Sequence, residues 1–199
     1  MAAGRENTIG SALVLTLLFC SVLRPSSLLR AQDSVPASRQ VVILMRALAY
    51  DGNLKSRAGN AVNIAILDKK GNAASENMAS AMTLAFRALE TSQVSGLPIV
   101  VSRLDYVGEK ALRKAIADTG IDFMYVCDGL DTPLDDIERI TRQMKVLSAG
   151  SKQEQVEKGL SIGVFPIETK STIVLNLSAS QQEGVSFAAD LLRMAKVVR

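Results

Sequence analysis

The chain has 199 residues, which is enough for one ordinary globular domain, and 48% of them are apolar, so a substantial core is available. It contains no histidine and two cysteines. These counts exclude Ser-His-Asp and Cys-His catalysis, histidine-ligated metal centres and a four-thiolate zinc site. The formal net charge of +3 is mildly basic and invites comparison with nucleic-acid-binding proteins.

The first 31 residues have the pattern of a secretory signal peptide. Arg5 precedes an apolar run over residues 11–23, which is shorter than the about 20 apolar residues that span a bilayer. Arginine, proline and two serines over residues 24–27 end the run, and Ala31 offers a cleavage point. We therefore expect a signal peptide over 1–31 and an exported, periplasmic or secreted protein; an uncleaved membrane anchor is the alternative.

Removal of this leader changes the charge balance. It takes away three arginines and one glutamate, so the net charge falls from +3 to +1. The remaining chain has no stripe of lysine and arginine interleaved with aromatic residues, so we expect no nucleic-acid partner. Cys127 is then the single cysteine, and an exported protein with one cysteine has no internal disulfide.

The rest of the chain reads as alternating helices and strands. Residues 32–39 contain Pro36 and are expected to be a flexible lead-in to a single domain over 40–199. Apolar spacing and β-branched runs then predict a helix over 38–55, a strand over 61–67, a helix over 73–91, a strand over 97–101, a helix over 106–118, a strand over 121–127, a helix over 133–143, a strand over 145–148, a polar connection with one helical turn over 151–158, strands over 160–167 and 172–177, and a final helix from 178 or 180 to about 197.

This order predicts an α/β domain. Strands that alternate with helices favour a mostly parallel sheet flanked by helices on both faces. The last two strands are separated by a short charged turn, which predicts a C-terminal β-hairpin followed by a closing helix. No dinucleotide-binding or P-loop glycine pattern is present in the sequence, so we expect no cofactor.

The densest group of acids follows the third predicted strand. Open α/β sheets bind ligands at the carboxyl ends of their strands, so Asp128, Gly129 and Asp131 are candidate ligand-binding residues, and the two aspartates could hold a divalent cation. The alternative, which we favour, is structural: Asp135 and Asp136 suit the first turn of a helix, and Asp128 and Gly129 form a turn.

Two further features have a functional and a structural interpretation. Cys127 is interpreted as a buried residue at a strand end, since the adjacent Asp128 opposes the thiolate that a reactive cysteine needs. The polar residues of the first helix could form a surface that faces a partner, although a plain solvated face is the simpler interpretation. These residues are Arg46, Tyr50, Lys55 and Arg57.

The last forty residues carry a recognisable order of motifs: a glycine before a strand, a charged turn, a strand ending in asparagine, small residues with a glycine, and a helix ending in two leucines and an alanine. These positions are Gly159, Lys170, Asn176, Ala179, Gly184, Leu191, Leu192 and Ala195. They resemble the C-terminal signature of the YfiR-like family of exported bacterial proteins. The first predicted helix and strand also resemble the family's opening, so the resemblance extends along residues 40–198. Unlike some relatives, the chain that remains after the leader is removed has no pair of cysteines.

The resemblance implies a periplasmic α/β protein without catalytic activity. The best-known member restrains a membrane-bound diguanylate cyclase, an enzyme of cyclic-di-GMP signalling, through that enzyme's periplasmic domain. We therefore expect a non-enzymatic regulator whose partner is a membrane-bound signalling protein, and we leave self-association into a homodimer open. The alternative is a periplasmic small-molecule binding module that uses the crevice beside Asp128 and Asp131.

Overall fold

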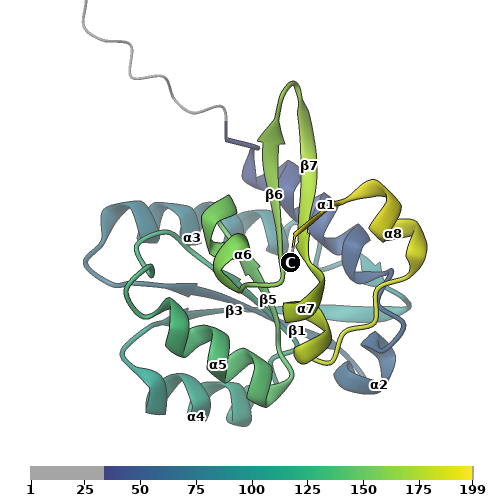
Figure 1. Ribbon diagram of the computed structural model, residues 1–199. Coiled ribbons are helices and arrows are strands. Elements are labelled where there is room, and N and C mark those ends of the chain that lie inside the picture. The colour runs from purple at the N-terminus through teal and green to yellow at the C-terminus, as the bar shows by residue number, and fades with distance from the viewer. Residues whose placement is uncertain (1–33, 199) are drawn as a thin grey trace, which may run out of the picture. The chain divides into compact units, whose positions relative to one another are not determined.

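The computed structural model describes residues 34–198 (Figure 1). The predicted signal peptide over 1–31 therefore lies outside the described residues. Across residues 34–198, every helix is too short or too polar to cross a lipid bilayer.

One eight-stranded sheet forms the centre of the domain (Figure 1). The strand order is β2-β3-β1-β4-β5-β6-β7-β8. The five strands β3, β1, β4, β5 and β6 are mutually parallel, β2 and β7 are antiparallel to their neighbours β3 and β6, and β8 runs parallel to β7. The strands are β1 (Val62–Asp68), β2 (Gln93–Val94), β3 (Leu97–Asp105), β4 (Phe123–Val126), β5 (Leu147–Gly150), β6 (Ile162–Ile167), β7 (Lys170–Asn176) and β8 (Lys196–Val198). The predicted mostly parallel sheet is confirmed.

Helices cover both faces of the sheet, as predicted. They are α1 (Ala37–Leu48), α2 (Leu54–Ala58), α3 (Ala73–Arg87), α4 (Glu109–Thr119), α5 (Leu134–Met144), α6 (Gln153–Lys158), α7 (Leu177–Gln182) and α8 (Ala189–Met194). Apolar side chains of α1, α3 and α8 pack with one set of strand residues, and those of α4 and α5 pack with the alternate set. Successive strand residues point to opposite faces, so the two groups of helices lie on opposite sides.

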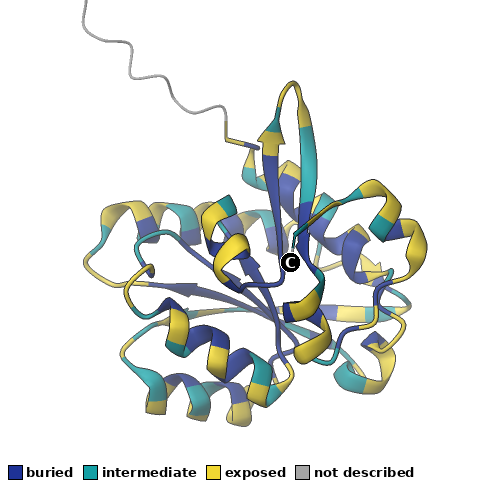
Figure 2. Ribbon diagram, in the orientation of Figure 1, coloured by how far each residue is buried: buried dark blue, intermediate teal, exposed yellow. Residues whose placement is uncertain are grey.

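The core is continuous through the central strands, which are buried along their length (Figure 2). Phe123 and Tyr125 of β4 point to the α1 and α3 side, while Met124 and Val126 point to the α4 and α5 side. A strand buried on both faces reads as a run of apolar residues rather than as an alternation. This is why residues 123–127 are apolar without interruption.

The first helix differs from its prediction at both ends. It begins at Ala37, inside the lead-in expected over 32–39, because Pro36 occupies the N-cap and Val35 is buried against the core. It ends at Leu48, and the residues up to 55 belong to a turn and to the short helix α2. Gly52 and Asn53 lie in that turn, where residues that favour turns are expected.

The C-terminal segment also differs. The single helix predicted from 178 or 180 to about 197 is two short helices and a strand, because α7 ends at Gln182, α8 spans six residues, and β8 joins the sheet. Gly184 has a φ of +83°, a conformation that favours glycine and ends a helix. The β6–β7 hairpin is present, but it lies inside the sheet, since β8 pairs with β7 on its outer side.

The sequence prediction missed a second hairpin at the opposite edge. Val94 and Leu97 are paired across a two-residue turn, Ser95 and Gly96. Both turn residues have positive φ, 52° and 84°, which is the geometry of a type I′ hairpin. The Ser-Gly dipeptide is the local signal for this turn.

Candidate functional site

The predicted ligand crevice lies at the switch point of the sheet. Across the sheet the five parallel strands lie in the order β3-β1-β4-β5-β6. The chain leaves β1 for β3 on one side and later returns to β4 on the other side, so the connections diverge between β1 and β4. Ligands of doubly wound sheets bind outside the carboxyl ends of the strands at this point. The loop after β1, with Asn72, and the loop after β4, with Asp128 and Gly129, meet there. A Cβ atom on Gly129, whose φ is +79°, would lie 2.6 Å from Asn72 Nδ2.

Lys152 lies between the two candidate aspartates. Its ammonium group, which follows β5, forms an ion pair with Asp128 and lies 3.3 Å from Asp131 Oδ2. The hydrogen bond to Asp128 is the main cause that raises the pKa of Lys152. The structure places Asp128 and Asp131 on the same lysine, and Gly129 directly follows Asp128; ligand binding by these residues stays a prediction. Among the described residues no group of three or more metal-binding side chains occurs, and the lysine already supplies the positive charge at this position.

Replacing Lys152 by alanine is expected to lower the free energy of unfolding by no more than about 1 kcal/mol. All three side chains are between one third and one half exposed, and water and salt weaken ion pairs of this kind. Urea unfolding at low and high salt measures the effect, which should shrink as salt is added. A loss above about 2 kcal/mol, or one that is independent of salt, would contradict this expectation.

The neighbouring candidates have structural roles. Cys127 is fully buried, and burial is the main cause that raises the pKa of its thiol to about 12, so it is a core residue rather than a nucleophile. Asp135 and Asp136 lie in the first turn of α5, where carboxylates favour the helix dipole. Asp136 also forms an ion pair with Arg139, 2.6 Å away.

The polar residues predicted on the first helix are divided by the structure. Arg46 and Lys55 are exposed, and Tyr50 is half-buried. Arg57 does not face a partner, because its guanidinium lies 2.9 Å from the buried carboxylate of Asp51. It also donates to the carbonyl oxygen of Lys145 at 3.1 Å. Arg57 therefore stabilises the domain, and only part of the predicted surface is available for contact.

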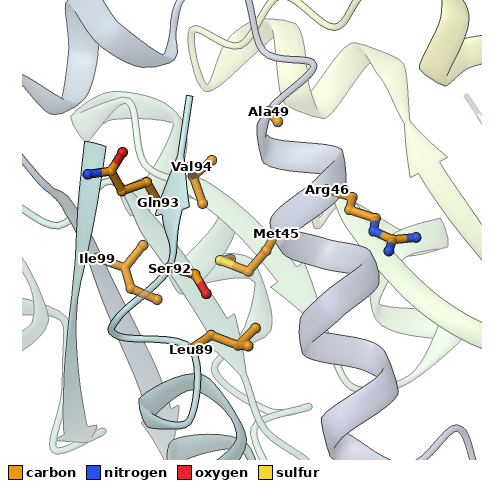
Figure 3. A pocket seen from close by; sticks show the side chains of 8 residues that line it. All are labelled: Met45, Arg46, Ala49, Leu89, Ser92, Gln93, Val94 and Ile99. Carbon is orange, nitrogen blue, oxygen red and sulfur yellow. The ribbon is translucent and has the colours of Figure 1, made fainter. Parts of the chain in front are cut away.

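An apolar groove lies beside the exposed part of α1 (Figure 3). Its volume is about 170 Å³, and it is open to solvent. In Figure 3 the side chains of Met45 from α1, Leu89 from the segment after α3, and Val94 and Ile99 from the β2–β3 hairpin surround it. The full set, called the α1 groove below, is Met45, Arg46, Ala49, Leu89, Ser92, Gln93, Val94 and Ile99. It lies near the beginning of β3, away from the predicted crevice, and the sequence prediction missed it because it depends on the β2–β3 hairpin.

A buried carboxyl group lies near the beginning of β5 and β6, at the end of the strands opposite the predicted crevice. Glu183, immediately after α7, is fully buried. Its Oε1 lies 2.7 Å from Thr141 Oγ1 and 2.6 Å from Ser148 Oγ, and its Oε2 accepts from the backbone N–H of Ser148 at 2.9 Å and from the Ser161 hydroxyl. Burial is the main cause that raises the pKa of Glu183, and the hydrogen bonds act in the opposite direction. The sequence prediction missed this cluster, because its members are distant in the chain.

The signature residues have identifiable structural roles. Asn176 accepts from the backbone N–H of Ala179 at 3.0 Å and so caps α7, while its amide donates to the carbonyl oxygen of Val156 at 3.1 Å. Gly159 ends α6, and a Cβ atom there would collide with the carboxylate of Glu138. Gly184 ends the α7 segment, Leu191 is buried in the core, and Leu192 packs against it.

Solved structures show which folds the domain is similar to. An ABC domain in complex with L-Trp from Streptococcus pneumonia has a TM-score of 0.54 at 14% identity, with 82% of this chain and 62% of that chain covered. A conserved domain protein from Vibrio cholerae has a TM-score of 0.56 at 16% identity, covering 82% and 60%. A ligand-free, open substrate-binding protein with adhesive properties from Clostridium difficile has a TM-score of 0.52 at 13% identity, covering 74% and 57%.

These likenesses show the α/β fold alone, because all three identities are below 25%. The alignments with them extend over about 60% of the length of those proteins. No curated protein matches the chain significantly in sequence. A family model, described as YfiR/HmsC-like (DUF4154), matches residues 50–196, which is well over half of the chain and includes every signature position named above. The chain therefore belongs to the YfiR/HmsC-like family.

Proposed function

We propose that this protein is an exported, non-enzymatic regulator that controls a membrane-bound signalling protein, a cyclic-di-GMP cyclase or a sensor, by contact with its periplasmic domain. Membership of the YfiR/HmsC-like family over residues 50–196 carries the proposal. The sequence supports it by containing no histidine, which removes the commonest general base. The ion pairs of Lys152 also support a non-enzymatic role. They engage Asp128 and Asp131, which belong to the densest group of carboxylates in the sequence.

The α1 groove is the surface that we assign to this contact. Arg39, Val42 and Arg46 lie three and four residues apart on α1, so they share one face of the helix beside the groove. Val42 is 37% exposed, and both arginines are exposed. Within residues 34–198 neither arginine forms an ion pair. The complementary partner is a segment that places an apolar side chain in the groove and carries acidic residues next to it.

Site-specific photo-crosslinking from this surface tests the proposal. A photoreactive residue at Ala49, on the groove, is expected to capture an inner-membrane protein with a cyclase or sensor domain in the native host. The same residue at Lys114, exposed on α4 across the sheet, is the matched control and should not capture that protein. Capture of the same proteins from both positions, or of none with a signalling domain, would contradict the proposal.

Substitutions in the groove should then weaken binding to the captured periplasmic domain. We expect Ala49→Glu and Arg46→Glu each to raise the dissociation constant at least tenfold, or about 1.4 kcal/mol. A carboxylate in an apolar groove loses hydration, and reversal of the arginine repels an acidic partner. Lys114→Glu should leave the dissociation constant unchanged. Calorimetry measures all three, and equal affinities for wild type and both groove variants would remove the α1 groove from the proposal.

A small-molecule binding module is the second candidate. The switch point between β1 and β4 favours it, because this is where doubly wound sheets bind ligands. A thermal-shift panel that includes free amino acids, applied to wild type and to the double variant Asp128→Ala and Asp131→Ala, tests it. A ligand-induced rise in melting temperature that is lost in the double variant would support binding in this crevice. A rise that persists in the double variant would exclude this crevice as the binding site.

A further inference from the structure

The hydrogen-bond geometry around Glu183 points to a proton held inside the fold. Thr141 Oγ1 lies 2.7 Å from Glu183 Oε1 and 3.0 Å from the carbonyl oxygen of Glu138. A hydroxyl group has one hydrogen to donate. If Glu183 is ionised, Glu183 Oε1 and the carbonyl oxygen of Glu138 are both acceptors. The single hydrogen of the Thr141 hydroxyl can then serve one of these two contacts, and the other contact has no hydrogen.

A neutral carboxylic acid satisfies every contact. Glu183 Oε1–H donates to Thr141 Oγ1, which in turn donates to the carbonyl oxygen of Glu138. The Ser148 hydroxyl still donates to Oε1, and the backbone N–H of Ser148 and the hydroxyl of Ser161 still donate to Oε2. The Ser148 oxygen accepts from the backbone N–H of Ser161 at 3.0 Å. Each hydroxyl hydrogen then has one acceptor.

The charges around the cluster do not compensate an anion. On the α5 side these are Glu138, which repels a charged Glu183, and Arg142, whose guanidinium is 3.3 Å from Glu138 Oε2. Lys145, after α5, donates to the carbonyl oxygen of Gln182, and Arg57, from α2, pairs with Asp51. Within residues 34–198, no lysine or arginine forms an ion pair with Glu183. A buried carboxylate without a cation is strongly disfavoured.

We propose that Glu183 is a proton-dependent latch: its neutral carboxylic acid fastens the segment from α7 to α8 onto α5, β5 and the residue before β6, and loss of the proton releases that segment. The three hydroxyl partners belong to those three places in the chain, 42, 35 and 22 residues away from Glu183. The same segment contains Gly184 and Leu191 of the family signature. This proposal does not depend on the identity of the partner.

Carbon-13 NMR of the glutamate side-chain carboxyls in the intact protein tests the protonation state, with the Glu183→Gln spectrum identifying the signal. We expect Glu183 to titrate above the ordinary pKa of about 4.3. Because the folded pKa is raised, the folded state binds more protons above the unfolded pKa, and stability falls as pH rises towards the folded pKa. Between the unfolded and the folded pKa, the unfolding equilibrium constant of the wild-type protein, divided by that of Glu183→Gln, should increase by up to tenfold for each pH unit. Titration at or below about 4.3, or the opposite slope, would overturn the proposal.

Hydrogen exchange distinguishes local release of this segment from a general loss of stability. The main measurement uses the wild-type protein, so it does not depend on whether Glu183→Gln folds. After correction for intrinsic exchange rates, protection of the amides over 179–191 should fall with rising pH more steeply than protection of β1 and β4. Glu109→Gln is the matched control, since Glu109 lies on α4 and is held by ion pairs with Arg113 and Arg139 rather than by hydroxyls. It should leave the pH dependence over 179–191 in place. Parallel loss of protection throughout the domain would overturn the latch.

Discussion

Replacing Asp51 by alanine is expected to lower the free energy of unfolding by about 3–5 kcal/mol, the usual cost of leaving a buried charge without its partner. The carboxylate of Asp51 is fully buried and lies 2.9 Å from the guanidinium of Arg57, which is 12% exposed. Its other oxygen accepts from the backbone N–H groups of Asn53 and Ser186, each at 2.9 Å. Removal of this one side chain therefore unpairs a cation and two backbone N–H donors, and it weakens the attachment of the segment before α8 to the end of α1.

Chemical unfolding of three variants measures this effect and separates its parts. Asp51→Asn keeps an oxygen for the two N–H groups but removes the charge, so its loss should lie between wild type and Asp51→Ala. Asp136→Ala is the matched control, because it removes an exposed carboxylate from an ion pair with Arg139 and should cost less than about 1 kcal/mol. Equal losses for Asp51→Ala and Asp136→Ala would show that the buried pair does not hold these segments together.

Replacing Phe123 by alanine should have an effect of similar size, about 3–5 kcal/mol, through a cavity in the centre of the core. Phe123 lies on β4, is fully buried, and packs against Phe86 of α3 with ring centroids 6.1 Å apart. The substitution removes an aromatic ring from the junction between the sheet and α3. Val100→Ala on β3, where the side chain is 52% exposed, should change stability by less than about 0.5 kcal/mol. A cost for Phe123→Ala below about 2 kcal/mol would mean that the core closes over the cavity.

The elements that could be predicted are those whose residues carry a complete local pattern. The strand over residues 61–67 and the helix from residue 73 are examples, and both were placed to within a few residues of β1 and α3. Local patterns failed where a segment is short and is held by distant residues. The residues of β8 read as the end of a helix, because the preceding alanines and leucines have helical spacing, but their partners are in β7.

The same reasoning explains how much of the site was predicted. Asp128, Gly129 and Asp131 are close in sequence and follow a strand, so their proximity could be inferred. The lysine that pairs with them is 21 residues beyond Asp131, and its position depends on the order of β4 and β5 in the sheet. Glu183 and Arg57 had no sequence signal for their buried partners, since hydrogen bonds and ion pairs of this kind are specified by the packed fold.

The short strand β2 leaves most of β3 at an open edge of the sheet. It pairs with Leu97 and Pro98 alone, so from residue 99 to 105 one side of β3 has no neighbouring strand within residues 34–198. Such an edge can recruit a strand from another molecule and start aggregation. Within this open part of β3 the charged Arg103 and Asp105 interrupt the apolar pattern, which is a usual protection of an edge strand. These two residues therefore protect the folded domain against intermolecular sheet growth at high concentration.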